Sequence, residues 1–166
     1  DTLMQGEVPA TRQLLDVYER VGTCVVALEE VPLARVSRYG VIVGERLKGP
    51  VWTVRDLVEK PAPEEAPSRL VIASRYILEP EIFGALAQVR PGKGGEIQLT
   101  DALRMLARQR PLHGCQVASI RHDAGNNLDF IKTNIHYALE RDDLKTALGD
   151  FIIEMAAAID RQRRGG

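Results

Sequence analysis

Amphipathic segments alternate along this chain with short runs of β-branched and aliphatic residues, and this alternation constrains the fold most strongly. Apolar residues recur at three- and four-residue spacing over 9–21, which predicts a helix that Gly22 ends. Residues 23–31 follow as an apolar run typical of a strand buried on both faces. Helices that alternate with such strands predict an α/β fold with a mixed, mainly parallel sheet.

The same patterns predict the remaining elements. The polar, turn-like stretch at 44–50 lies between two strand candidates, which we expect to pair as a hairpin. Thr100 and Asp101 are expected to cap the N–H groups of the helix that they open. Residues 1–150 are expected to form one domain, followed by a helix and basic tail at 151–166. Further strands are expected at 39–44, 51–58, 70–78 and 116–120, and further helices at 79–89, 98–109, 128–140 and 142–160.

Charge and cysteine content exclude several classes of protein. The 166 residues include 22 Lys and Arg against 23 Asp and Glu, a net charge of −1, which gives no electrostatic reason to bind nucleic acid or a membrane surface. No apolar run approaches the roughly 20 residues that span a bilayer. Two cysteines cannot form a disulfide framework, so a reducing, cytoplasmic location is expected.

Two polar clusters lie at the ends of predicted strands. Glu59 and Lys60 follow an apolar strand, where a carboxylate can accept sugar hydroxyls and an ammonium can hold a phosphate. Gly40 begins another strand after an aromatic residue, where a glycine allows close approach of a ligand to the backbone. Each cluster also has a structural explanation: the first as a surface ion pair, the second as a turn glycine.

Two further clusters lie in loops that precede helices. The stretch 92–101 is glycine-rich, contains Glu96, and could surround an anion, or it could be a flexible loop before a helix. Asp123 follows a strand and precedes a glycine, which suits a hard cation such as Mg²⁺. Capping of the next helix is the alternative role for Asp123.

Taken together and in order, these segments resemble the C-terminal part of bacterial UTP–glucose-1-phosphate uridylyltransferases, which are sugar nucleotidyltransferases. The resemblance covers roughly residues 1–152, and its most diagnostic stretch is Glu-Ile-Gln-Leu-Thr-Asp. Ser74 is a departure, because a glycine is frequent at that position. The matching segments are RYGVI at 38–42, VEKP at 58–61, APSRL at 66–70, RYIL at 75–78, GEIQLTDA at 95–102 and DAGN at 123–126.

The resemblance implies a Rossmann-like nucleotidyltransferase fold that here lacks its N-terminal, nucleotide-binding half. It implies formation of UDP-glucose and pyrophosphate from UTP and glucose-1-phosphate, with Mg²⁺. The residues that it places at the site are Glu59 and Glu96 at the sugar, Lys60 as the catalytic group at the sugar phosphate, Gly40 with its backbone at the sugar, and Asp1 and Asp123 at the metal.

Three alternatives stay open at this point. The chain alone could be an inactive part of that enzyme, or a non-catalytic module for sugar-phosphate binding or assembly. The parent could be a glucose-1-phosphate thymidylyltransferase, since such enzymes share the Tyr-Gly and Glu-Lys-Pro segments. The helical C-terminus, finally, favours a homo-oligomer.

Overall fold

The computed structural model describes residues 2–92 and 95–165, and within them the expected alternation of helices and strands is present. The strands are β1 (Thr2–Gln5), β2 (Val25–Glu30), β3 (Gly40–Arg46), β4 (Val51–Glu59), β5 (Leu70–Ile77), β6 (Leu112–Gln116) and β7 (Ile120–Asp123). The helices are α1 (Ala10–Val21), α2 (Glu81–Leu86), α3 (Leu99–Gln109), α4 (Asn127–Leu139) and α5 (Lys145–Arg164), with short 3₁₀ turns at Leu33–Arg38 and Pro63–Glu65.

The main sheet is mixed but mainly antiparallel, so the prediction of a mainly parallel sheet is wrong. Its strands pair in a closed order, β2-β5-β3-β4-β6, and β1 pairs with β7 in a separate two-stranded sheet. Among the described pairings of the closed sheet, β2 with β6 is parallel and the others are antiparallel. Parallel pairing needs a long crossover. The chain provides one between β2 and β6, whereas β3 and β4 are joined by a tight hairpin.

The predicted hairpin of β3 and β4 is confirmed, and it positions the polar residues at its open end. Gly40 at the start of β3 pairs with Glu59 at the end of β4. The register shifts between Val43 and Gly44, which leaves Arg55 of β4 as an extra residue at a bulge. The first residue of one strand and the last residue of the other are thereby fixed side by side.

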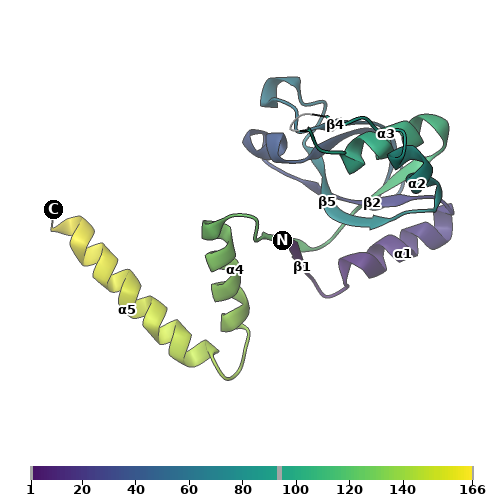
Figure 1. The fold of residues 1–166 in the computed structure, drawn as a ribbon. Coiled ribbons are helices and arrows are strands. Elements are labelled where there is room, and N and C mark those ends of the chain that lie inside the picture. Colours follow the sequence, from purple (N-terminus) through teal and green to yellow (C-terminus); the bar gives the residue numbers. More distant parts are fainter. Residues whose placement is uncertain (1, 93–94, 166) are drawn as a thin grey trace. The chain divides into compact units, whose positions relative to one another are not determined.

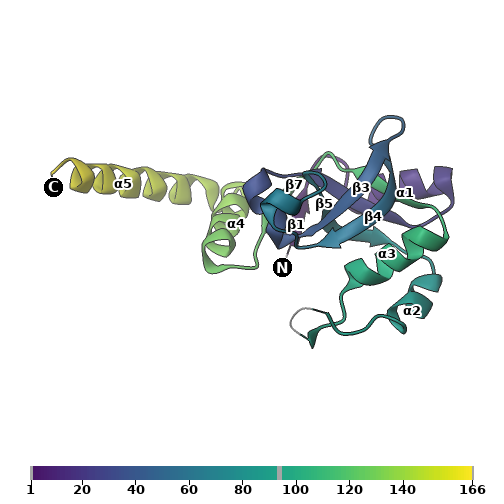
Figure 2. The same ribbon diagram turned by 90° about the horizontal axis from the view of Figure 1, so that it is seen from above.

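Helices cover both faces of the closed sheet, as Figures 1 and 2 show. On one face α1 packs its buried residues Leu14 and Val17 against Val25 and Ala27 of β2. On the other face α2 and α3 pack against residues such as Leu28 in the larger cluster of the core. Each fully buried aliphatic side chain contributes about 1.5–3 kcal/mol to folding, which explains why Val, Leu and Ile suffice where aromatic residues are few.

Two boundaries differ from the sequence prediction. The strand expected at 116–120 is replaced by β6 and β7, which flank that range. Residue 114 of β6 is a glycine because a Cβ there would lie 2.3 Å from Leu28 Cδ1. The polar His113 and this glycine interrupt the apolar pattern by which a strand is predicted from the sequence. The last helix extends to Arg164, so most of the predicted basic tail is helical.

The chain divides into two compact units, Met4–Ile120 and Arg121–Gly166 with the first residues of the chain. The closed sheet with α1, α2 and α3 forms the first unit, and β7, α4 and α5 belong to the second. The predicted division after residue 150 falls within α5 and stays a prediction. None of the described helices is long and apolar enough to cross a membrane.

Candidate functional site

A cavity of about 530 Å³ lies where β4 ends and α3 begins. Three of the predicted site residues, Glu59, Lys60 and Glu96, line it. The end of β4 and the turn after it contribute one part of the lining, and the segment before α3 with the first turn of that helix contributes another. The lining residues are Ser37, Glu59, Lys60, Pro61, Ala62, Glu96, Gln98 and Asp101.

Glu59 and Lys60 form an acid–base pair at the edge of this cavity. Lys60 Nζ lies 3.5 Å from Glu59 Oε1, with the lysine side chain 54% exposed and the glutamate side chain 21% exposed. Lys60 has a φ of 45°, which is uncommon for a residue other than glycine, and its N–H donates to Tyr39 O at 3.0 Å. Such strain costs of order 1–3 kcal/mol and concentrates at functional sites. The turn therefore holds an exposed ammonium beside a half-buried carboxylate.

Gly40 is buried against the same carboxylate. A Cβ at position 40 would lie 2.9 Å from Thr100 Oγ1 and 3.2 Å from Glu59 Oε2. The sequence analysis predicts that a ligand approaches the backbone of Gly40 closely. In the structure, the side chains of Glu59 and Thr100 make this close approach. Glycine here lets β3, β4 and the start of α3 meet without displacing Glu59.

We expect Gly40→Ala to weaken binding of a sugar phosphate, because the added methyl group must displace Glu59 or Thr100. Overpacking of this kind costs about 1–3 kcal/mol, which corresponds to roughly tenfold or more in affinity if it falls on the bound geometry. Calorimetric titration with glucose-1-phosphate measures the change. In the matched double variant Gly40→Ala with Thr100→Ala the nearest clash is removed, so affinity should partly recover; no recovery would contradict this explanation.

The N-terminus of α3 has no side-chain cap from its N-cap residue. Gln98 is the N-cap residue, and among the described residues no side chain caps this end, so the expected capping by Thr100 and Asp101 is wrong. Gln98 Nε2 instead donates to Glu96 Oε2 at 3.2 Å. Asp101 N donates to Gln98 O at 3.1 Å, and this end of α3 lies beside the cavity, where the positive end of the helix dipole favours an anion.

A forked ion pair ties α3 to β4 a few residues from the cavity. Arg104 donates to both carboxylate oxygens of Asp56, from Nε at 2.7 Å and from Nη2 at 3.1 Å, and Arg108 Nη2 lies 3.9 Å away. The Arg104 hydrogen bonds hold the pKa of Asp56 below its usual range. The sequence analysis missed this pair, although Asp101, Arg104 and Arg108 recur at helical spacing on one face.

Asp56→Asn is expected to lower stability at neutral pH, because the variant loses the charge of the fork. A carboxyl group whose pKa is lowered by folding stabilises the protein above its unfolded pKa, about 3.9, and loses that contribution as the pH falls through the folded value. Urea unfolding at several pH values should therefore show a difference between wild type and Asp56→Asn that shrinks below about pH 4. A difference that is constant down to pH 2 would contradict a charge-based role.

Tyr76 brings a phenol to the same region. Burial, and after it the charge of Glu59, raises the pKa of Tyr76 above its ordinary value. The hydroxyl group therefore stays protonated at neutral pH and can donate a hydrogen bond. Tyr76 belongs to β5, so a third strand contributes a polar side chain beside the end of the hairpin.

Asp123 lies in the second unit, at the end of β7, whereas Lys60 belongs to the first. Its Oδ1 accepts a hydrogen bond from Gly125 N at 2.9 Å. Asn126, not Asp123, caps α4, by accepting from Asp129 N at 3.0 Å. Asp1 is outside the described residues, and the described part of the chain has no cluster of three His, Cys, Asp or Glu side chains arranged for a metal ion. A carboxylate oxygen suits Mg²⁺, so Asp123 fits one ligand position.

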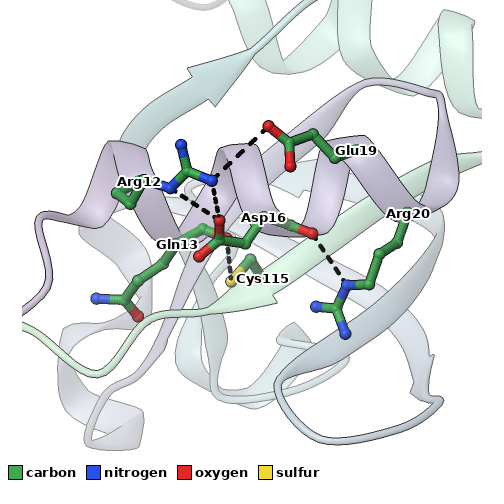
Figure 3. Close-up of polar contacts among 6 residues, drawn as sticks. All are labelled: Arg12, Gln13, Asp16, Glu19, Arg20 and Cys115. Atoms are coloured by element: carbon green, nitrogen blue, oxygen red, sulfur yellow. Dashed lines mark hydrogen bonds and ion pairs between the residues drawn. The ribbon is translucent and has the colours of Figure 1, made fainter.

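A second cavity, of about 450 Å³, lies under α1 and includes a cysteine, but its chemistry is not that of a nucleophile. Figure 3 shows Cys115 below α1, with its Sγ 3.8 Å from Gln13 O. Burial raises the pKa of Cys115 to about 11, and burial also raises the pKa of Cys24. Both thiols are thus protonated at neutral pH, and we assign no thiolate chemistry to either.

Residues 4–140 match the family model described as nucleotidyl transferase. The chain belongs to the nucleotidyl transferase family. It is 43% identical over 148 residues to the UTP–glucose-1-phosphate uridylyltransferase YngB of Bacillus subtilis strain 168, covering 89% of this chain and 50% of that protein. It is 41% identical to UTP–glucose-1-phosphate uridylyltransferase 1 of Streptococcus pyogenes serotype M1, covering 93% of this chain and 51% of that protein.

Solved structures of the same family share the fold. A UDP-glucose pyrophosphorylase complexed with UDP-glucose superposes with a TM-score of 0.81 at 40% identity, covering 84% of this chain and 54% of that chain. The UTP-bound enzyme of Acinetobacter baumannii superposes with a TM-score of 0.79 at 27% identity, covering 92% and 53%. The nucleotidyltransferase-type α/β fold expected from the sequence is therefore confirmed. The chain spans about half the length of the curated relatives that it matches.

Proposed function

We propose that this chain is the sugar-phosphate-binding part of a UTP–glucose-1-phosphate uridylyltransferase. The observation that carries the proposal is one cavity in which Glu59 and Lys60, at the end of β4, meet Glu96 from the segment before α3, with Gly40 packed behind Glu59. A half-buried carboxylate can accept hydrogen bonds from hexose hydroxyls, and an exposed ammonium can hold the phosphate. Two relatives at 43% and 41% identity carry that activity in their names.

The proposed reaction forms a bond between the phosphate oxygen of glucose-1-phosphate and the α-phosphorus of UTP, and it releases pyrophosphate. Such transfers depend on positioning and charge neutralisation, with no protein nucleophile required. Lys60 would hold the sugar phosphate and offset its charge as the bond forms. Glu59 would accept hydrogen bonds from hexose hydroxyls. Glu59 would thereby discriminate against a sugar that lacks the matching hydroxyl, because its half-buried carboxylate would lose a hydrogen bond.

The proposal includes Mg²⁺, for which Asp123 and Asp1 would be ligands. When bound, Mg²⁺ would neutralise phosphate oxygens. Asp123 would supply one carboxylate, and its bond from Gly125 N orients that carboxylate. The role of Asp1 rests on the family resemblance.

Titration of the 166-residue chain with glucose-1-phosphate, UDP-glucose and UTP tests the proposal by calorimetry. We expect heats of binding for glucose-1-phosphate and UDP-glucose. We expect no release of pyrophosphate from UTP with this chain alone, because the chain spans about half the length of its relatives. Turnover by the chain alone would contradict the proposal that it is an incomplete, inactive part. Absence of any sugar-phosphate binding would contradict the assignment of the cavity.

The alternatives are separated by two further measurements. Binding without turnover is also what a non-catalytic sugar-phosphate module would show, so activity must be assayed in a longer protein that includes this chain. In that protein, comparison of UTP with dTTP separates a uridylyltransferase from a thymidylyltransferase. A putative thymidylyltransferase structure at 20% identity shares only the fold and does not favour the second.

For partners, we propose a cytoplasmic homo-oligomer that binds neither nucleic acid nor membrane. The near-neutral charge supports the exclusion of polyanionic partners.

A further inference from the structure

One end of the closed sheet holds a cavity of about 410 Å³, which we call the mouth cavity. All five strands line it from this end: β2, β3 and β6 near their last residues, and β4 and β5 near their first. Closed sheets commonly bind small molecules at their open ends, in cavities of roughly 300–1,000 Å³. The lining of the mouth cavity includes Glu30, Arg46, Trp52, Arg69, Leu70 and Gln116.

The mouth cavity is separate from the cavity proposed for the sugar phosphate. Gly40 lies beside Glu59 at one end of β3 and Arg46 lies at the other end, and the 7 residues of this strand span about 20 Å at 3.3 Å per residue. Among the described residues, none lines both cavities. Both cavities belong to the first unit, so a ligand in the mouth cavity would bind this unit at a second place.

The inner part of the mouth cavity is apolar. Ile42 and Leu70 are buried there and belong to the larger cluster of the core, against which Trp52 packs. Trp52 Nε1 is buried and has no hydrogen-bond partner among the described residues. A buried donor that lacks an acceptor is destabilising, so a turn of the indole toward an acceptor on a bound ligand would be favourable. The inner part therefore suits an apolar body that carries an acceptor.

The rim of the mouth cavity is charged and carries two arginines and one glutamate. Arg69 Nη2 donates to Glu30 Oε1, so these two charges compensate each other. Arg46 Nε donates to Gly49 O at 2.9 Å, while its Nη1 and Nη2 have no hydrogen-bond partner in the part of the chain that the structure describes. The two terminal nitrogens of a guanidinium can bind both oxygens of one carboxylate. The rim therefore presents one cation that an anionic ligand can pair with.

We propose that the mouth cavity binds a small organic carboxylate whose body is an apolar ring. The carboxylate would pair with Arg46, and the ring would pack against Trp52 and Leu70. The two arginines and one glutamate give the lining a net charge of +1, which a monoanion neutralises. A phosphate dianion would instead leave excess negative charge beside Glu30. The inference goes beyond the proposed function and does not depend on it.

Trp52 makes a direct test possible, because it is the only tryptophan of the 166-residue chain. Titration with phenylacetate should change the fluorescence of Trp52 and saturate with a Kd of about 1 mM, as expected for a ligand of this size. Acetate keeps the charge without the ring, and 2-phenylethanol keeps the ring without the charge, so each should bind at least about tenfold more weakly. No saturable change with phenylacetate, or equal binding of either control compound, would overturn the proposal.

A matched pair of variants tests the role of the cation. Arg46→Gln should weaken phenylacetate binding about tenfold or more, because a charge-assisted hydrogen bond to the carboxylate is lost. Arg55→Gln makes the same change on the same hairpin but outside the mouth cavity, and it should leave binding unchanged. Unchanged binding in Arg46→Gln, or an equal loss in both variants, would overturn the proposal.

Glu30→Gln tests the proposal by a gain, which a folding defect cannot imitate. The variant removes the negative charge of the rim and releases Arg69, so phenylacetate should bind about threefold or more tightly. Weaker or unchanged binding in Glu30→Gln would contradict a site selected by its net positive charge. Circular dichroism of each variant verifies that the sheet still forms.

Competition separates this site from the one proposed for the sugar phosphate. Saturating glucose-1-phosphate should leave the response of Trp52 to phenylacetate in place, and Lys60→Ala should leave it unchanged as well, since Lys60 lines the other cavity. Displacement of phenylacetate by glucose-1-phosphate would overturn the proposal, because the probe would then occupy the sugar site. Phenylacetate binding without any sugar-phosphate binding would contradict the proposed function alone.

Discussion

Lys60→Ala is expected to lower the kcat/KM of a longer, active protein by about tenfold or more, and to weaken binding of glucose-1-phosphate to this chain. The variant removes the ammonium that lies at the edge of the cavity, 3.5 Å from Glu59. Lys60 is 54% exposed, so its loss should leave the free energy of unfolding nearly unchanged. Steady-state kinetics and calorimetry measure the two effects.

Lys60→Arg serves as the matched control for this prediction. It keeps the positive charge but changes its shape, so binding should recover in part if charge is the main contribution. Unchanged kcat/KM in Lys60→Ala would remove Lys60 from the mechanism. A loss of affinity accompanied by an equal loss of stability would assign the lysine to the fold instead of the ligand.

Gly44→Ala is expected to destabilise the first unit by about 3 kcal/mol, or roughly 10 °C in Tm, because the hairpin has no room for a side chain there. A Cβ at position 44 would lie 2.0 Å from the carbonyl oxygen of Thr53, which belongs to the paired strand. The register shift between Val43 and Gly44 places this close contact at the bulge. Since the hairpin also fixes Gly40 beside Glu59, ligand binding should weaken together with stability.

Gly84→Ala makes the same chemical change where nothing lies within 4 Å, in the exposed part of α2. It should raise the free energy of unfolding by about 0.5–1 kcal/mol, since alanine is the better helix former. Urea denaturation of both variants gives the comparison. Equal and small effects at the two positions would contradict the claim that the hairpin bulge is closely packed.

The positions of the residues proposed for the site were easier to predict from the sequence than the direction of the strands. Glu59 and Lys60 stand at the end of an apolar run, so their place at a strand end follows from local pattern. The antiparallel order of the sheet depends on which strands meet in space. β6 is difficult to predict for a related reason. The glycine at position 114 is explained by its contact with Leu28, which is far away in the sequence.

The residues that line the cavity from the segment before α3 and from its first turn were also difficult to predict, because their place depends on contacts between distant elements. The candidate loop at 92–101 includes Glu96, Gln98 and Asp101, although only Glu96 is given a role there, and the fork between Asp56 and Arg104 is missed. Helical spacing shows which side chains share a face, but not which strand that face meets. Ser74 illustrates what a resemblance adds: its φ of 54° explains why a glycine would suit this position.

Crystals of this chain soaked with glucose-1-phosphate would test the central claim most directly. The account predicts electron density for the hexose in the cavity between the end of β4 and the start of α3, with hydroxyls on Glu59 and the phosphate within reach of Lys60 Nζ. Density for the sugar elsewhere on the chain, with this cavity empty, would contradict it.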